Sequence, residues 1–110
     1  MSLTESQFHD LVDTTQRNLE DIIDANDIDI DIESSAGILT LTFENQHQVI
    51  LSRQEPLKQL WLADRSGGFH FDYDSEQAQW FCASTQQTLT QMLSEIFLTH
   101  TQHSFDLSSL

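Results

Sequence analysis

The strongest constraint on the fold is a change of hydrophobic period close to residue 26. Before that point, apolar side chains recur every three or four residues, which predicts an amphipathic helix over residues 5–25. Thr4 and Gln7 have the spacing of a capping box at its start. After that point, isoleucines alternate with acids over residues 27–33, which predicts a half-buried strand. Helix and strand would therefore each give one apolar side to a core.

The rest of the chain continues the strand pattern and then returns to a helical one. Turns separate short alternating segments, and we expect strands at residues 39–44, 47–53, 57–63, 69–73 and 79–82. Helical spacing then predicts a second helix over residues 85–100, capped by Ser84 and Gln87. A polar tail that contains Phe105, Leu107 and Leu110 follows.

This order of elements predicts an α+β fold. Two helices would pack on one face of a five- to six-stranded antiparallel sheet, as a two-layer α-β sandwich. A length of 110 residues without a linker or repeat fits a single domain over residues 1–110. The other face of the sheet would stay uncovered. Trp61 stands between two leucines that fit the core, so we expect it on the uncovered face, as an interface hot spot unless the tail or a loop covers it.

Charge is the second informative feature. The chain has 18 Asp and Glu against four Lys and Arg, a formal net charge of −14. It lacks the basic patch that nucleic-acid binding requires, and its charge disfavours anionic membrane surfaces. The charge favours basic proteins or metal cations as partners. Seven of the acids, and no base, fall between Glu20 and Glu33.

This acidic segment works against stability. Glu20, Asp21 and Asp24 lie near the C-terminus of the predicted helix, where each negative charge costs about 0.3–1 kcal/mol. Carboxylates on one face of the following strand stand about 7 Å apart, which gives about 0.6 kcal/mol of repulsion per pair in bulk water. A surface that served solubility alone would intersperse lysines. We therefore favour a binding role; a merely solvated face is the alternative.

The acidic segment is not a calcium loop. An EF-hand starting at Asp27 would need Gly where Ile32 stands and Glu where Ile38 stands. A surface of carboxylates still attracts hard cations such as Fe²⁺, Fe³⁺ or Mg²⁺, although without a cage such sites are weak. His100 and His103 could bind a metal if the helix continued, but two exposed polar residues are the simpler interpretation.

Signals for catalysis are missing from the sequence. Cys82 lies in an apolar run, which favours a core position over a nucleophile. His70 and Asp72 share a strand face without an accompanying nucleophile, and His47 carries no signal beyond surface polarity. There is no glycine loop for phosphate and no dinucleotide motif. We therefore expect a protein that is not an enzyme.

The sequence also indicates the cellular compartment of the protein. A single cysteine excludes an internal disulfide framework. The N-terminus has neither the basic nor the apolar region of a signal peptide, and no apolar run reaches the roughly 20 residues of a membrane span. A cytoplasmic protein is expected.

Four segments occur in order along the chain, namely Leu41–Asn45, Arg53–Leu57, Gln59–Ala63 and Gly67–Asp72. Together with the acidic helix and strand that precede them, they resemble the frataxin family, and most closely its bacterial branch. The resemblance extends from about Phe8 to the second predicted helix. Four ordered motifs at compatible spacing make it specific.

The resemblance implies an iron-binding regulator of iron–sulfur cluster assembly, mostly monomeric. Family members bind iron (Fe²⁺/Fe³⁺) weakly at surface carboxylates and dock on the cysteine desulfurase IscS, where they modulate sulfur transfer to the scaffold. The metal-binding residues that the resemblance implies here are Glu20, Asp21, Asp24, Asp27, Asp29, Asp31 and Glu33, with Glu44 nearby. The contacts to the partner that it implies are Asn45, Gln54, Gln59 and Trp61. We call the seven carboxylates from Glu20 to Glu33 the acidic ridge.

Two other functions stay open at this stage. An iron donor or ferroxidase would use the same carboxylates but would need ordered iron sites. An acidic DNA mimic would occupy a nucleic-acid-binding protein, although that function gives no reason for the motifs at residues 53–57 and 67–72.

Overall fold

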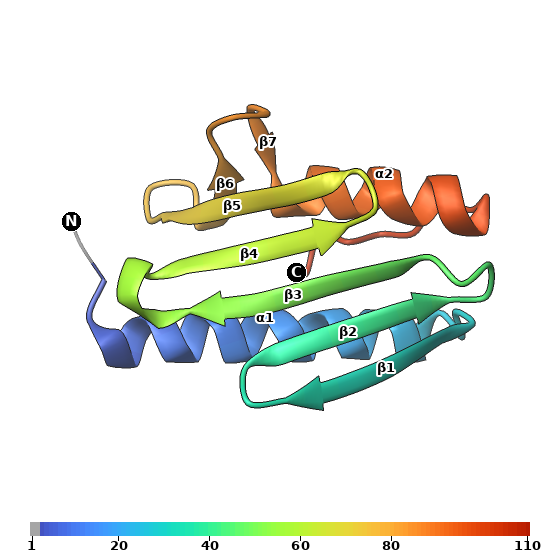
Figure 1. Cartoon of the computed structure of the whole chain (residues 1–110), viewed down its shortest axis with the longest axis horizontal. Helices are drawn as coiled ribbons and strands as arrows, with labels where there is room; N and C mark the ends of the chain where they lie inside the picture. Colours follow the sequence, from blue (N-terminus) through green and yellow to red (C-terminus); the bar gives the residue numbers. More distant parts are fainter. Residues whose placement is uncertain (1–2) are drawn as a thin grey trace.

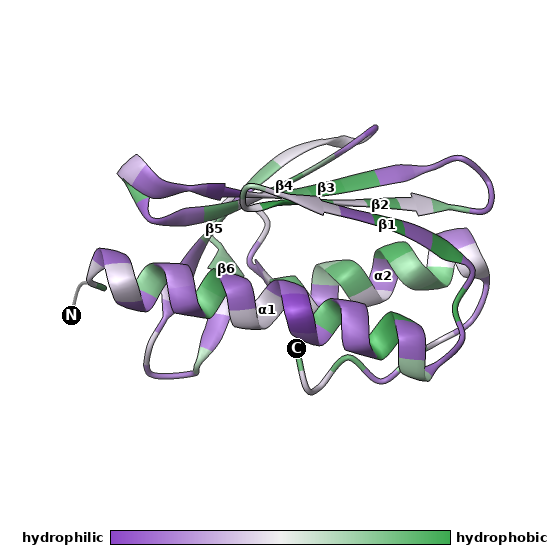
Figure 2. Ribbon diagram, turned by 90° about the horizontal axis from the view of Figure 1, so that it is seen from below, coloured by the Kyte–Doolittle hydropathy of each residue, from purple (hydrophilic) through white to green (hydrophobic). Residues whose placement is uncertain are grey.

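The computed structural model describes residues 3–110 and has two layers. Its elements in chain order are α1 (Glu5–Ala25), β1 (Ile30–Ser35), β2 (Ile38–Phe43), β3 (Gln48–Gln54), a 3₁₀ turn η1 (Glu55–Leu57), β4 (Gln59–Asp64), β5 (Gly67–Asp74), β6 (Gln79–Cys82), β7 (Gln87–Thr88) and α2 (Leu89–Thr101). All strands form one antiparallel sheet in the order β1 to β7, so each pairs with its neighbours in sequence (Figure 1). Figure 2 shows both helices on the same side of the sheet. The predicted two-layer α+β sandwich is confirmed, with seven strands in place of the expected five or six.

The core lies between the helices and the face of the sheet that they cover. Strand alternation sends every second side chain of β2, β3 and β4 into this layer, as the two-residue period requires. Fully buried side chains from the strands are Leu39, Leu41, Phe43, Val49, Leu51, Leu60, Leu62 and Phe71. They meet Phe8, Val12, Leu19, Leu89, Leu93 and Phe97 from the helices. Within residues 3–110, no helix is long and apolar enough to span a membrane.

Helix α1 has the bounds and the cap that the sequence predicts. Thr4 and Gln7 form the capping box, in which each side chain accepts a hydrogen bond from the other residue's backbone N–H. Two polar residues, Thr15 and Gln16, lie on its buried face. The Gln16 Nε2 donates to the carbonyl oxygens of Gly37, at 3.1 Å, and Leu51, at 3.3 Å. This side chain ties the middle of the helix to the β1–β2 turn and to β3, and the two acceptors satisfy an amide donor that would otherwise be costly to bury.

The strand predicted at residues 27–33 begins three residues later than expected. Asp27 has a left-handed backbone, with φ of 52°. Its N–H bonds to the Asp24 carbonyl at 3.2 Å, and the Ile28 N–H bonds to the Ile23 carbonyl at 3.1 Å. These two bonds form a Schellman motif that ends α1 with aspartate where glycine is usual. The three isoleucines face the core as expected: Ile30 is buried, and Ile28 and Ile32 are half-buried and pack against the core.

The start predicted for the second helix is also wrong. Helix α2 begins at Leu89, and its capping box is formed by Thr88 and Gln91 instead of Ser84 and Gln87. The reason is that Gln87 pairs with β6 as part of β7, so the backbone there is extended. The sequence contains the same capping-box spacing twice, and strand pairing selects the second.

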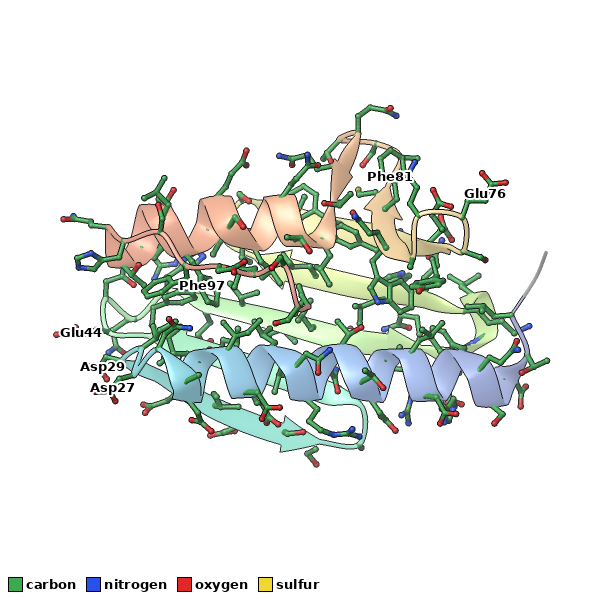
Figure 3. All side chains as sticks on the ribbon, turned by 180° about the vertical axis from the view of Figure 1, so that it is seen from behind. Asp27, Asp29, Glu44, Glu76, Phe81 and Phe97 are labelled. Atoms are coloured by element: carbon green, nitrogen blue, oxygen red, sulfur yellow. The ribbon has the colours of Figure 1, made fainter. Side chains whose placement is uncertain are left out.

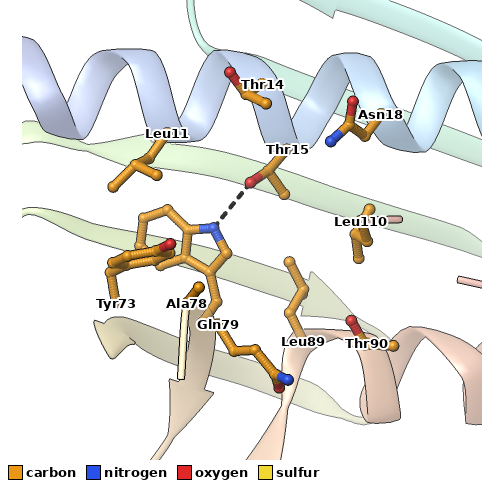
Figure 4. A pocket seen from close by; sticks show the side chains of 11 residues that line it. Leu11, Thr14, Thr15, Asn18, Tyr73, Ala78, Gln79, Leu89, Thr90 and Leu110 are labelled. Atoms are coloured by element: carbon orange, nitrogen blue, oxygen red, sulfur yellow. Dashed lines mark hydrogen bonds between the residues drawn. The ribbon is translucent and has the colours of Figure 1, made fainter. Parts of the chain in front are cut away.

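The tail after α2 returns to the helical layer. Leu107 is buried, and the Asn18 Nδ2 of α1 donates to the Ser109 carbonyl at 3.0 Å. Leu110 lines a cavity of about 130 Å³ between α1, β6 and α2 (Figure 4). On the wall of that cavity, the Trp80 Nε1 donates to the Thr15 Oγ1 at 3.0 Å.

Substitution of the observed cap should identify the start of α2 in solution. We expect Thr88→Ala to lower the free energy of unfolding by about 1 kcal/mol, because the Gln91 N–H loses its acceptor. Ser84→Ala serves as the matched control and should cost clearly less. Urea denaturation of the two variants measures both values. A larger loss for Ser84→Ala would contradict the observed helix start.

Candidate functional site

The acidic ridge runs along one edge of the molecule. Glu20, Asp21 and Asp24 lie on the last turns of α1, Asp27 and Asp29 in the connection, and Asp31 and Glu33 on the edge strand β1. All are exposed except Glu20, which is half-buried. The left-handed turn at Asp27 leads from the helix into the strand.

The charge of the ridge is not compensated within the described part of the chain. The ion pairs there join Arg53 to Asp13 and Glu55, His9 to Glu55, and His47 to Asp64. None of them includes a ridge carboxylate or Glu44. Because neutralising partners are missing, the ridge keeps its field and would attract a cationic surface or free cations.

The ridge is not an ordered metal cage. Among residues 3–110, no three His, Cys, Asp or Glu side chains lie close enough together to hold a metal ion. Carboxylate oxygens suit hard cations such as iron, but a site of high affinity needs several ligands that converge on one point. The geometry therefore fits weak and poorly selective binding.

Glu44 is brought by the fold to the middle of the ridge, where the chain passes from α1 to β1. Figure 3 shows Asp27, Asp29 and Glu44 at the same end of the molecule. They line a hollow of about 340 Å³ together with His100 and His103, which follow from the end of α2. The sequence predicted two exposed polar residues at these positions; His103 is exposed, whereas His100 is half-buried. No local signal could have linked them to the acids, since more than 50 residues separate them from Glu44.

A polar and aromatic platform occupies the uncovered face of the sheet. Leu60 and Leu62 are buried on the helical side, whereas Trp61 between them is half-exposed, as predicted. Its ring stacks on His70, with centroids 4.1 Å apart and an angle of 8° between the planes. Its Nε1 donates to the Gln59 Oε1 at 2.8 Å, and the Gln59 Nε2 donates to the Asp72 Oδ1 at 3.2 Å. These contacts hold the indole in one orientation.

The four predicted partner contacts do not form one cluster. Gln54 and Gln59 are paired across β3 and β4, two residues from Trp61, so three of the four lie together. Asn45 lies in the β2–β3 turn, before β3 begins, while Gln54 is the last residue of β3. The side chain of Asn45 bonds to His100 and to the backbone of His47.

Two histidines and the cysteine have distinct surroundings. Cys82 is buried, in agreement with its predicted place in the core. His70 is exposed and supports Trp61 instead of pairing with Asp72. The prediction that His47 is an ordinary surface residue is wrong, because it is 7% exposed and packs against α2.

The fold and the acidic edge define a class of small two-layer α+β proteins, and comparison with known proteins identifies the family. The family model of the frataxin-like domain matches residues 1–103. A Pseudomonas fluorescens protein named iron-sulfur cluster assembly protein CyaY is 64% identical over 98 residues, which is 89% of each chain. A protein of the same name from Pseudomonas syringae pv. tomato is 52% identical over the full length of both chains. The chain belongs to the frataxin family.

Solved structures agree with this assignment. The frataxin of Psychromonas ingrahamii has a TM-score of 0.87 and 30% identity, covering 94% of this chain and 97% of its own. A trimeric yeast frataxin, solved in complex with ferrous iron, has a TM-score of 0.68 and 28% identity, covering 94% of this chain and 90% of its own. The strand layer and both helices are thus shared with frataxins of bacterial and yeast origin.

The repulsion within the ridge should be measurable at Asp27. We expect Asp27→Asn to raise the free energy of unfolding by about 0.5 kcal/mol at low ionic strength, because it removes a negative charge from the C-terminus of α1. Asparagine tolerates the left-handed backbone, so strain does not change. The gain should shrink in salt, which screens exposed charges. Thermal or urea unfolding at two salt concentrations provides the measurement.

Glu5→Gln is the matched control for this substitution. It removes an equal charge from the first turn of the same helix, where a carboxylate is favourable, and should destabilise slightly. If Asp27→Asn failed to stabilise at low salt, the ridge would not store repulsive energy.

Proposed function

We propose that this protein is a non-enzymatic regulator of iron–sulfur cluster assembly, cytoplasmic and mostly monomeric, which docks on a cysteine desulfurase through the acidic ridge. It modulates sulfur transfer to the scaffold on which clusters are built. The observation that carries the proposal is the ridge itself, seven carboxylates without a cationic partner among residues 3–110. Such a surface lowers stability in isolation and gains most when a basic surface covers it.

The names of the relatives support the assignment to iron–sulfur assembly. The similar Pseudomonas proteins are named for this process, and two of them match at 64% and 52% identity. The geometry adds a mechanism. A continuous acidic edge steers a basic partner during approach, which raises the association rate at low salt more than it raises the final affinity.

The platform around Trp61 supplies the second part of the docking surface. Gln54, Gln59 and Trp61 lie side by side on the uncovered face, and Trp61 is held in place by Gln59 and His70. A pre-oriented indole loses little conformational freedom on binding, which is why tryptophans dominate many interfaces. The ridge would therefore determine the association rate and its salt dependence, and the platform around Trp61 would determine the register in which the partner binds.

Calorimetric titration into a cysteine desulfurase tests the role of the ridge. The informative variant changes Glu20, Asp24, Asp27, Asp29 and Asp31 to Gln or Asn. We expect the native protein to bind with micromolar affinity that weakens in salt, and the variant to bind about tenfold more weakly or not at all.

A matched control separates ridge position from total charge. It changes five acids outside the ridge, Glu5, Asp10, Glu76, Glu95 and Asp106, to the corresponding amides, and so alters the net charge equally. This control should retain most of the affinity. Equal losses of affinity in both variants would mean that net charge, and not the position of the ridge, determines binding. No binding by the native protein would refute the docking proposal.

Trp61→Ala completes the titration series. Because Trp61 lies outside the buried core, its removal should leave the fold intact. We expect a loss of roughly 2 kcal/mol in binding free energy that does not depend on salt, in contrast to the ridge variant. An unchanged affinity would place the indole outside the interface.

Iron binding to the ridge is the second part of the proposal. One relative of known structure was solved with ferrous iron, and the carboxylates here fit a hard cation without forming a cage. In an anaerobic Fe²⁺ titration, we expect paramagnetic broadening of NMR signals from residues 20–33 that increases gradually without a fixed stoichiometry. The five-residue ridge variant should lose this broadening. Tight stoichiometric binding would instead favour an iron donor or ferroxidase.

A further inference from the structure

Two histidines from distant parts of the chain stack face to face. His47 lies in the β2–β3 turn and His100 in the last turn of α2. Their ring centroids are 3.6 Å apart and their planes are inclined by 8°. Phe43 packs against both rings, at 5.9 Å from His47 and 5.6 Å from His100. The stack is therefore the contact that joins the end of α2 to this turn.

Asn45 determines which protonation state of His100 fits this contact. The Asn45 Oδ1 accepts a hydrogen bond from the backbone N–H of His47 at 3.0 Å, which fixes the orientation of the amide. The Asn45 Nδ2 therefore points to the His100 Nδ1, at 3.0 Å, as a donor. A ring nitrogen accepts this bond only when it carries no proton. Protonated His100 would bring two N–H groups against each other.

The other ring of the stack lies beside a carboxylate. His47 is buried, and its Nε2 lies 3.3 Å from the Asp64 Oδ2, a contact that lacks the alignment of a hydrogen bond. Asp64 is itself held by Ser66, whose N–H and hydroxyl donate to the Asp64 Oδ1 at 2.8 and 2.6 Å. Positive charge on both stacked rings would be repelled across 3.6 Å.

We propose that Asn45, His47 and His100 form a pH-sensitive clasp, closed while His100 is neutral and opened when it is protonated. Opening would detach the last turn of α2 from the β2–β3 turn and free the amide of Asn45. The clasp needs no partner protein and no metal ion. The charged or titratable groups around it, from each element that packs there, are Glu44 in the β2–β3 turn, Asp64 and Arg65 after β4, Glu95 on α2, Asp27 and Asp29 after α1, and His103 in the tail.

The balance of these groups favours the neutral ring in the folded protein. Burial lowers the pKa of His100 below its ordinary value of 6.5, His47 and Arg65 lower it further, and Asp64 offsets only part of this. Since the opened state takes up the proton more readily, the closed clasp gives its full stability above pH 6.5 and loses it as the pH falls through the lowered pKa. Acid therefore opens the clasp.

NMR of the native protein measures both the titration of His100 and the opening of the clasp. The His100 ring should titrate below pH 6.5, and the side-chain amide signals of Asn45 should shift with the same midpoint. Just below pH 6.5, the backbone amides of residues 99–102 should lose up to about tenfold in protection against hydrogen exchange for each pH unit. This dependence is expected when opening of the clasp takes up one proton. A His100 titration at or above 6.5 would overturn the clasp.

The variant Asn45→Asp reverses the expected pH dependence. A carboxylate keeps the acceptor for the His47 N–H but replaces the donor to His100 with an acceptor, so it favours the protonated ring. Protection of residues 99–102 should then increase in acid. His103→Gln, which removes an exposed histidine outside the stack, should behave like the native protein. If Asn45→Asp kept the native pH dependence, the contact would be structural only and the clasp would be refuted.

Discussion

Burial of a single face of the sheet is the constraint on which the other properties of this protein depend. Strands β2 to β5 direct their leucines and phenylalanines to the side where α1 and α2 lie, and the two helices supply enough apolar surface to cover that side only. The opposite face must then be tolerable in water without a covering layer. It carries mainly threonines and glutamines, together with Ile38, Ile50 and the stacked pair of Trp61 and His70, which offers an aromatic anchor.

The same constraint explains where the acids can be placed. The edge strand β1 and the outer side of α1 meet solvent, so their charges do not disturb the core. Carboxylates on an edge strand also discourage pairing with a second sheet, which keeps an exposed edge from aggregating. The cost is mutual repulsion at the end of α1. We infer that this cost is retained because the surface has a binding role; Arg53, for its part, pairs with Asp13 and Glu55, which lie outside the ridge.

The local sequence pattern predicts much of the fold, but it predicts neither the start of α2 nor the burial of His47. The bounds of α1 and its capping box follow from spacing alone, and strand alternation predicted which face of β4 holds Trp61. The start of α2 could not be chosen locally, because two capping-box spacings compete and only the pairing of Gln87 with Cys82 excludes the first. The burial of His47 depends on His100, which lies 53 positions later, so no window of sequence could have shown it.

The connectivity of the two layers has a consequence for folding during synthesis. Each strand pairs with the next along the chain, so the sheet can grow hairpin by hairpin as residues leave the ribosome. The helical layer cannot close in that order, because α1 waits for Trp80 to reach Thr15 and for Ser109 to reach Asn18. The first helix to be made is thus among the last elements to be fully packed. Until α2 and the tail are made, part of the apolar face of the growing sheet stays uncovered, and the strongly negative N-terminal segment keeps such nascent chains apart by charge repulsion.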